Sequence, residues 1–168
     1  MNRRQWAMAG VGVSAAAAGL SWSLWRSTPA RADALWAMRL PQPNGAELVM
    51  ASLRGKPLLV NFWATWCAPC VRELPAINRF YQLTAGKGWQ VIGIAVDNLG
   101  PVTSFLSQVK LDFPVVLAGL DGLKLAQALG NPSGALPFSV VINARGEITH
   151  TKLGETSLDE LLRWANAT

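Results

Sequence analysis

The sequence holds only two cysteines and one histidine among its 168 residues. Cys67 and Cys70 are too few, and too close in the chain, to form the disulfide framework of a small secreted domain. Because His150 is the one imidazole, a zinc site of four cysteine or histidine ligands is excluded and no metal is expected. Charged residues make up only 15% of the chain and apolar residues 51%, which excludes a disordered polyelectrolyte.

Acidic residues are absent from residues 1–32, which contain four of the 15 basic residues of the chain. The remaining 136 residues therefore carry 11 basic against 10 acidic residues, so most of the net charge of +5 belongs to the N-terminal segment. Because the rest of the chain is close to neutral, the high isoelectric point does not indicate a nucleic-acid partner.

Residues 1–32 have the three parts of a secretory signal: a charged start, an uncharged run over 7–25, and a small-x-small site that ends at Ala32. The paired arginines near the start resemble a twin-arginine signal, although Asn2 replaces the usual serine or threonine and leaves the general route open. The 19-residue uncharged run is mostly Ala, Gly and Ser, which favours cleavage after Ala32; an uncleaved membrane anchor is the alternative. In both cases residues 33–168 face an oxidising compartment, the periplasm, where nearby cysteines can form a disulfide.

The rest of the chain alternates between strand and helix patterns. Short apolar runs at 35–40 and 47–53, separated by turn residues, predict short edge strands. Nearly unbroken apolar runs at 56–64 and 90–96 predict strands that are buried on both faces, as in a parallel sheet. Apolar residues recur at helical spacing over 71–81, so these segments form one βαβ unit.

The C-terminal half predicts a helix beginning at Pro101, a short strand, a second helix, an antiparallel hairpin, and a last helix with a capping box from Ser157 to Glu160. After the first helix, these elements are expected at residues 113–117, 123–129, 138–152 and 157–165. Their order indicates an α/β fold in which helices flank a mixed central sheet, with a short N-terminal β-extension.

Cys67 lies directly after the predicted strand over 56–64 and directly before a helix, so it is expected at the helix N-terminus. There, unpaired backbone N–H groups and the helix dipole stabilise a thiolate, which is the nucleophile in thiol–disulfide exchange. Cys70 is one turn further into the helix, so it should be more buried and can resolve a mixed disulfide on Cys67. Pro69 stiffens the segment at no cost in hydrogen bonding. A redox dithiol is favoured over a structural disulfide, idle thiols or a zinc pair.

The segment from Asn61 to Pro75, Asn-Phe-Trp-Ala-Thr-Trp-Cys-Ala-Pro-Cys-Val-Arg-Glu-Leu-Pro, resembles the active-site segment of thioredoxin-like proteins. It is most similar to the exported TlpA/ResA-type thiol–disulfide oxidoreductases. Residues 134–146 resemble the second landmark of that family, a proline in cis before a strand and a turn. The similarity extends over about residues 36–165 and implies a thioredoxin-like domain over 33–168.

The resemblance implies a substrate-binding role for several matching residues. Pro137 would face the cysteines in cis, and its missing N–H would leave a backbone edge open to an extended substrate. The alternative is a trans proline at the start of a strand. Leu136 would contact the surroundings of the incoming cysteine, and Trp66, with Ala68 and Pro69, would contact the partner from the other side.

The resemblance also implies that Glu73 is a partly buried carboxylate that assists deprotonation of Cys70 through water. The alternative is a solvated helix charge paired with Arg72 or Arg79. Asn61 occupies the place of a buried aspartate in cytosolic thioredoxins. Because an amide takes up no proton, a base must come from Glu73 or from water.

The implied function is an exported thiol–disulfide oxidoreductase that reduces disulfides in client proteins, of the cytochrome c maturation or oxidase copper-site assembly type. Cys67 would attack, Cys70 would resolve, and a membrane thiol donor would reduce the pair again, with no cofactor. Two alternatives stay open: an oxidant that runs the same chemistry in reverse, and a non-catalytic binding module that keeps its disulfide for rigidity. A thiol peroxidase is disfavoured because its Pro-x-x-x-Thr approach to a lone cysteine is absent.

Overall fold

The structure, a computed structural model, describes residues 32–168 and contains one mixed sheet of five strands in the spatial order β5-β4-β3-β6-β7. β3, β4 and β5 are parallel, whereas β6 and β7 are joined to them in antiparallel pairs. This arrangement confirms the predicted mixed sheet. The strands are β3 (Leu58–Trp63), β4 (Gln90–Ala95), β5 (Val115–Leu117), β6 (Phe138–Ile142) and β7 (Ile148–Leu153).

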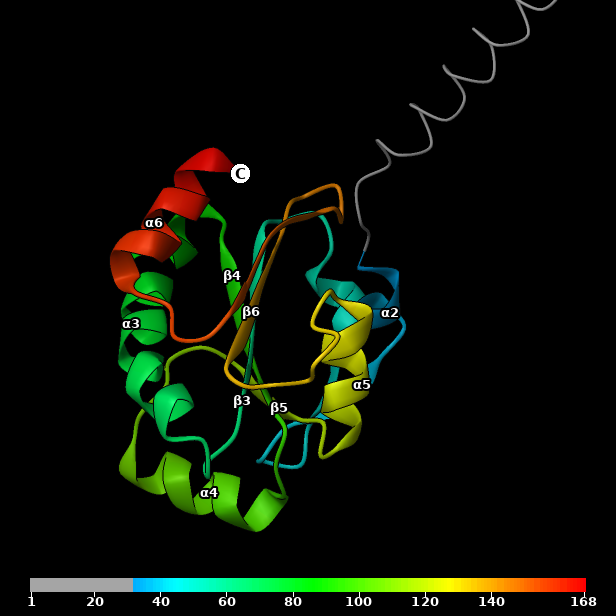
Figure 1. Cartoon of the computed structure of the whole chain (residues 1–168), viewed down its shortest axis with the longest axis vertical. Helices are drawn as coiled ribbons and strands as arrows, with labels where there is room; N and C mark the ends of the chain where they lie inside the picture. The colour runs from blue at the N-terminus through cyan, green and yellow to red at the C-terminus, as the bar shows by residue number, and fades with distance from the viewer. Residues whose placement is uncertain (1–31) are drawn as a thin grey trace, which may run out of the picture. The chain divides into compact units, whose positions relative to one another are not determined.

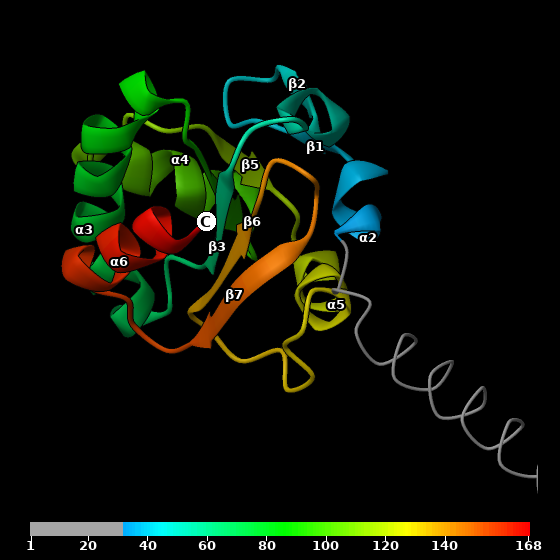
Figure 2. The ribbon, with the colours of Figure 1, turned by 90° about the horizontal axis from the view of Figure 1, so that it is seen from above.

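Helices cover both faces of this sheet (Figure 1). Figure 2 shows α3, α4 and α6 on one face, and α2 and α5 with a separate two-stranded hairpin on the other. The helices are α2 (Asp33–Trp36), α3 (Ala68–Thr84), α4 (Leu99–Gln108), α5 (Asp121–Ala128) and α6 (Leu158–Ala167), with short 3-10 turns η1 (Met50–Leu53) and η2 (Ala85–Lys87). None of the helices within residues 32–168 is long and apolar enough to cross a membrane.

The central strand β3 is buried along its whole length, as its apolar run predicts. Its side chains alternate between the two faces of the sheet. Val60 and Phe62 belong to the core beneath α2 and α5, whereas Leu59 and Trp63 belong to the core beneath α3, α4 and α6. Asn61 shares the second of these faces, where its amide is completely buried.

The predicted N-terminal β-extension is confirmed as a two-stranded hairpin, but its strands do not lie at the edge of the main sheet. β1 (Arg39–Pro41) and β2 (Glu47–Val49) pair only with each other, and the chain before them forms the helical turn α2. Leu35, Trp36 and Met50 are buried in the core on the α5 face. The N-terminal extension therefore covers one face of the sheet with apolar side chains, and its backbone does not join the hydrogen-bond ladder of the sheet.

The remaining element predictions hold with small shifts. α4 begins at Leu99, two residues before the predicted Pro101, because Asn98 takes the extended N-cap conformation. Half of the predicted capping box is present, with the N–H of Glu160 donating to Ser157 Oγ at 3.3 Å, while the Glu160 carboxylate pairs with Lys152. The predicted leader over 1–32 lies outside the described residues apart from Ala32. Ala32 is buried, and its N–H donates to a carbonyl oxygen of the β6–β7 turn at 3.2 Å.

Candidate functional site: a disulfide at the N-terminus of α3

Cys67 and Cys70 form a disulfide with an S–S distance of 2.05 Å. Cys67 is the N-cap of α3, and its sulfur accepts a hydrogen bond from the Cys70 N–H at 3.3 Å. Cys70 is completely buried, while Cys67 retains 6% of its surface exposed. The predicted helix N-terminus and the predicted difference in burial are both confirmed, so the sulfur that lies in the field of the helix dipole is also the more accessible one.

The residues around the disulfide come from two directions. Trp66 is 67% exposed directly before Cys67, and Ala68 and Pro69 open the first turn of α3. The Leu136–Pro137 peptide bond is cis, so the alternative of a trans proline is wrong. Pro137 precedes β6, and Phe138 pairs with Phe62 of β3, which places the proline at the sheet edge where β3 leads to Cys67. Leu136 packs against the cluster that contains both cysteines.

Glu73 is buried, with only 3% of its surface exposed, so the alternative interpretation of this residue as a solvated helix charge is wrong. Neither neighbouring arginine pairs with it. Arg72 forms an ion pair with Glu155, and Arg79 donates to Gln82 at 3.3 Å. Glu73 lies one turn beyond Cys70 on the side of α3 that faces the sheet.

Two hydrogen bonds hold the Glu73 carboxyl in place. Asn61 Nδ2 donates to Oε1 at 2.7 Å, and the Thr156 N–H donates to Oε2 at 2.6 Å. Asn61 Nδ2 also contacts Ser139 Oγ at 3.1 Å, while Asn61 Oδ1 and Thr156 Oγ1 are buried without a hydrogen-bond partner. Burial raises the pKa of Glu73 above its ordinary value, and the donors from Thr156 and Asn61 only partly oppose that rise.

Replacing Glu73 with glutamine is expected to remove a pH dependence of stability. Because the folded pKa lies above the unfolded value of 4.5, the stability linked to the protonated carboxyl is complete below that pH and is lost as the pH rises through the folded pKa. The free energy of unfolding falls over this window by about 1.4 kcal/mol for each pH unit between the two pKa values. Denaturant unfolding of the oxidised protein at a series of pH values measures this slope.

A glutamine can be accommodated because Asn61 Oδ1, which has no partner, can accept from its amide once the Asn61 side chain flips. Asp159→Asn, which neutralises an exposed carboxylate of α6, is the matched control and should keep the wild-type slope. An unchanged slope in Glu73→Gln would assign the pH dependence to another group.

The sequence reading missed Asp97, which reaches the segment before the disulfide. Its Oδ2 accepts from the Thr65 N–H at 2.9 Å and from the Thr65 hydroxyl at 2.6 Å. Its position in the sequence could have indicated this role, because Asp97 directly follows the apolar run that predicts a buried parallel strand. Carboxyl ends of parallel strands meet at one edge of a sheet, so Asp97 belongs at the same edge as Cys67.

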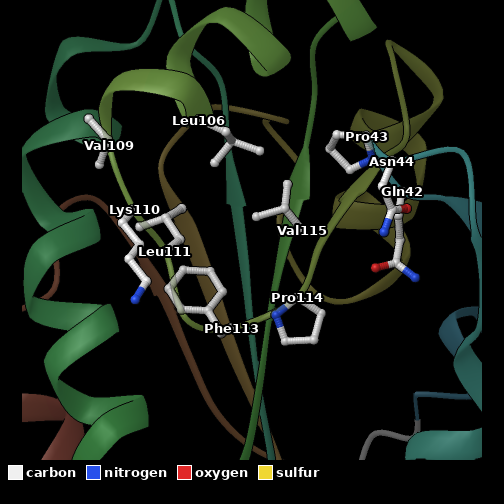
Figure 3. A pocket seen from close by; sticks show the side chains of 10 residues that line it. All are labelled: Gln42, Pro43, Asn44, Leu106, Val109, Lys110, Leu111, Phe113, Pro114 and Val115. Atoms are coloured by element: carbon white, nitrogen blue, oxygen red, sulfur yellow. The ribbon is translucent and has the colours of Figure 1, made fainter.

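Other features of the described residues do not compete with this site. No group of histidine, cysteine and acidic residues within residues 32–168 could hold a metal ion. A pocket of about 340 Å³ lies at the β5 edge, between the end of α4 and the β1–β2 turn. Figure 3 shows apolar side chains such as Leu106, Phe113 and Val115 on one side and Gln42 and Asn44 on the other. None of the predicted site residues lines it.

Comparison with known proteins agrees with the fold and the site. The model of the Redoxin family matches residues 30–162. Thiol-disulfide oxidoreductase ResA of Bacillus anthracis is 33% identical over 119 residues, which are 70% of this chain and 66% of that protein. The chain thus spans slightly less than two thirds of the length of this relative.

Solved structures extend the likeness over most of the described residues. A thiol:disulfide interchange protein from Chlorobium tepidum is 27% identical, with a TM-score of 0.71 over 83% of this chain and 94% of that one. A secreted disulfide oxidoreductase of Mycobacterium tuberculosis is 26% identical, with a TM-score of 0.68 over 81% and 99% of the two chains. The family match, the thioredoxin-like fold and the Cys67–Cys70 disulfide agree, and the chain belongs to the redoxin family.

Proposed function

We propose that this protein is an exported thiol–disulfide oxidoreductase that reduces disulfides in client proteins. The observation that carries the proposal is the Cys67–Cys70 disulfide at the start of α3, where one sulfur is partly exposed and the other is buried. The names of the relatives, thiol-disulfide oxidoreductase and thiol:disulfide interchange protein, support the same chemistry.

The reaction starts from the reduced form. The Cys67 thiolate attacks one sulfur of a client disulfide, which forms a mixed disulfide and releases the other client sulfur as a thiolate. The Cys70 thiol loses its proton and attacks Cys67 Sγ, which expels the second client sulfur. Two electrons thereby pass to the client, which gains two protons as its thiols form, and Cys67 and Cys70 end as the disulfide seen in the structure.

Three further groups assist these steps. Glu73, one helical turn beyond Cys70 and with a raised pKa, takes the Cys70 proton through water. Leu136 packs against the cluster that contains the disulfide, and the missing N–H of Pro137, directly before β6, leaves a backbone edge open to the client. Trp66, with Ala68 and Pro69, contacts the client on the opposite side.

The proposed clients are proteins that need reduced cysteines before they bind haem or copper, as in cytochrome c maturation or oxidase copper-site assembly. The proposed location is the periplasm, either free or tethered to the outer face of the cytoplasmic membrane. The secreted relative from Mycobacterium tuberculosis supports export. A membrane thiol donor then restores the dithiol, since the surrounding compartment is oxidising.

The equilibrium reduction potential of the Cys67–Cys70 pair tests the direction of electron flow. Titration against glutathione or dithiothreitol, followed by tryptophan fluorescence, should place it near or below about −230 mV, towards the thioredoxin value. Trp66 adjoins the disulfide, so its emission should report the state of the pair. A value near about −120 mV would instead assign an oxidant. A pair that resists strong reductants would favour the non-catalytic binding module.

A further inference from the structure

Asp97 connects the end of β4 to the turn that carries the disulfide. Besides the two bonds from Thr65, its Oδ1 accepts from the Asn98 N–H at 2.8 Å. Partial burial alone would raise the pKa of Asp97, but the hydrogen bonds from Thr65 and Asn98 outweigh it and hold the pKa below its ordinary value. The carboxylate is therefore ionised at neutral pH, and charge-assisted bonds of this kind are the stronger ones.

The turn over residues 64–67 is anchored at both ends by the buried residues Ala64 and Cys67, while Thr65 and Trp66 between them are more exposed. The Cys67 N–H donates to the Ala64 carbonyl at 3.2 Å, and the Val96 N–H donates to the Trp63 carbonyl at 2.8 Å. Trp66 is 67% exposed, so most of its ring has no protein surface to pack against. The backbone of Thr65 and Cys67 therefore sets the direction in which the Trp66 side chain leaves the turn.

An exposed aromatic ring contributes most to binding when it is held in place before the partner arrives. If the turn were free, each encounter with a protein client would have to order Trp66 and Cys67 together. A small disulfide offers far less surface to Trp66 than a protein client does. The two kinds of substrate therefore separate the presentation of Trp66 from the intrinsic reactivity of the thiolate.

We propose that Asp97 is a positioning residue for client recognition, an inference that rests on the proposed function. Its carboxylate binds both donors of Thr65 and so fixes the turn that presents Trp66 and the Cys67 sulfur to a protein client. The residue does not touch the reacting sulfurs. It acts through Thr65, and it increases the rate of reaction with protein disulfides rather than the reactivity of the Cys67 thiolate itself.

Reduced wild type, Asp97→Ala, Asp97→Asn, Thr65→Ser and Thr65→Val are compared on two substrates. One is a short synthetic peptide with a Cys-x-x-Cys-His disulfide, and the other is dithiobis(2-nitrobenzoate). Asp97→Ala should slow the peptide reaction about tenfold, the order expected for lost hydrogen bonds to a charged group, and the small disulfide at most about twofold. Asp97→Asn and Thr65→Ser, which keep an oxygen at the contact, should recover most of the peptide rate.

Asp112→Ala is the matched control. Asp112 also accepts two side-chain hydrogen bonds, from Gln82 at 2.7 Å and Asn78 at 3.2 Å, but it lies before β5, at the opposite end of the parallel strands. Thr65→Val removes the hydroxyl bond but keeps the N–H bond to Asp97, so it should show a smaller loss that is again confined to the peptide. Equal losses on both substrates in Asp97→Ala or in Thr65→Val, or a loss shared by Asp112→Ala, would overturn the positioning role. A wild type that reduces neither substrate would overturn the proposed function itself. Thr65→Val keeps the test decisive if Asp97→Ala fails to fold.

Discussion

Cys67→Ser is expected to abolish multiple-turnover reduction of client disulfides, with a loss of about 10⁴-fold or more, as for the removal of a catalytic nucleophile. Serine offers an N-cap oxygen in place of the Cys67 sulfur and so preserves the start of α3. Its hydroxyl, however, stays protonated at neutral pH and does not exchange with disulfides. The rate with a disulfide peptide, measured against the variant in which both cysteines are serine, gives the loss.

Cys70→Ser separates attack from resolution. Cys67 can still form the mixed disulfide, but the buried position that would expel the client now holds a hydroxyl. The variant should therefore accumulate a client adduct on Cys67, visible as a reductant-sensitive mass increase after expression in the exported compartment. If no adduct forms with Cys70→Ser, or if Cys67→Ser turns over at the wild-type rate, the exchange mechanism is wrong.

Trp63→Ala is expected to lower the free energy of unfolding by about 3–5 kcal/mol, the range for removal of a large buried aromatic. Trp63 is completely buried in the core on the α3 face, and the centroid of its ring lies 5.2 Å from the ring centroid of Phe105 in α4. No neighbouring backbone can collapse easily into the space, because Trp63 belongs to the central strand of the sheet. Denaturant unfolding of the oxidised protein measures the difference.

Trp63→Phe is the informative companion variant. The indole Nε1 of Trp63 is buried without a hydrogen-bond partner, so phenylalanine removes an unsatisfied donor as well as some volume. The loss should be clearly smaller than for alanine. A side chain at Gly93 would place its Cβ 3.0 Å from that Nε1, which explains why the neighbouring strand has glycine there. Equal losses for alanine and phenylalanine would mean that the indole N–H matters more than the packed volume.

Much of the fold could be predicted because its signals are local. The apolar run of β3 requires burial on both faces, and Ser157 caps the start of α6 where expected. The cysteines follow from the same logic, since a strand that ends directly before a helix places the next residues at the helix N-terminus. The resemblance supplied the buried carboxylate through residues 61–75 and the cis proline through residues 134–146, and no local pattern indicates either of them.

The unpredicted part of the site depends on residues that are distant in sequence. Thr65 and Asp97 are 32 residues apart, and Glu73 and Thr156 are 83 apart. Such pairs form only when the sheet and its crossovers are complete, so no periodicity announces them. The helical turn α2 before the hairpin was not predicted, for a related reason. Leu35 and Trp36 are adjacent apolar residues, which fit a strand or a helical turn equally well until the surface they cover is known.

The hydrogen bond from the Thr156 N–H to Glu73 gives the buried carboxyl a spectroscopic probe on the backbone. A proton shared with a carboxylate senses its charge, so the chemical shift of the Thr156 amide follows the ionisation of Glu73. Thr156 itself is buried and does not titrate, which keeps the signal specific. Nuclear magnetic resonance spectra of the oxidised and reduced protein would therefore read the charge of Glu73 on both sides of the disulfide exchange, without a label near the sulfurs.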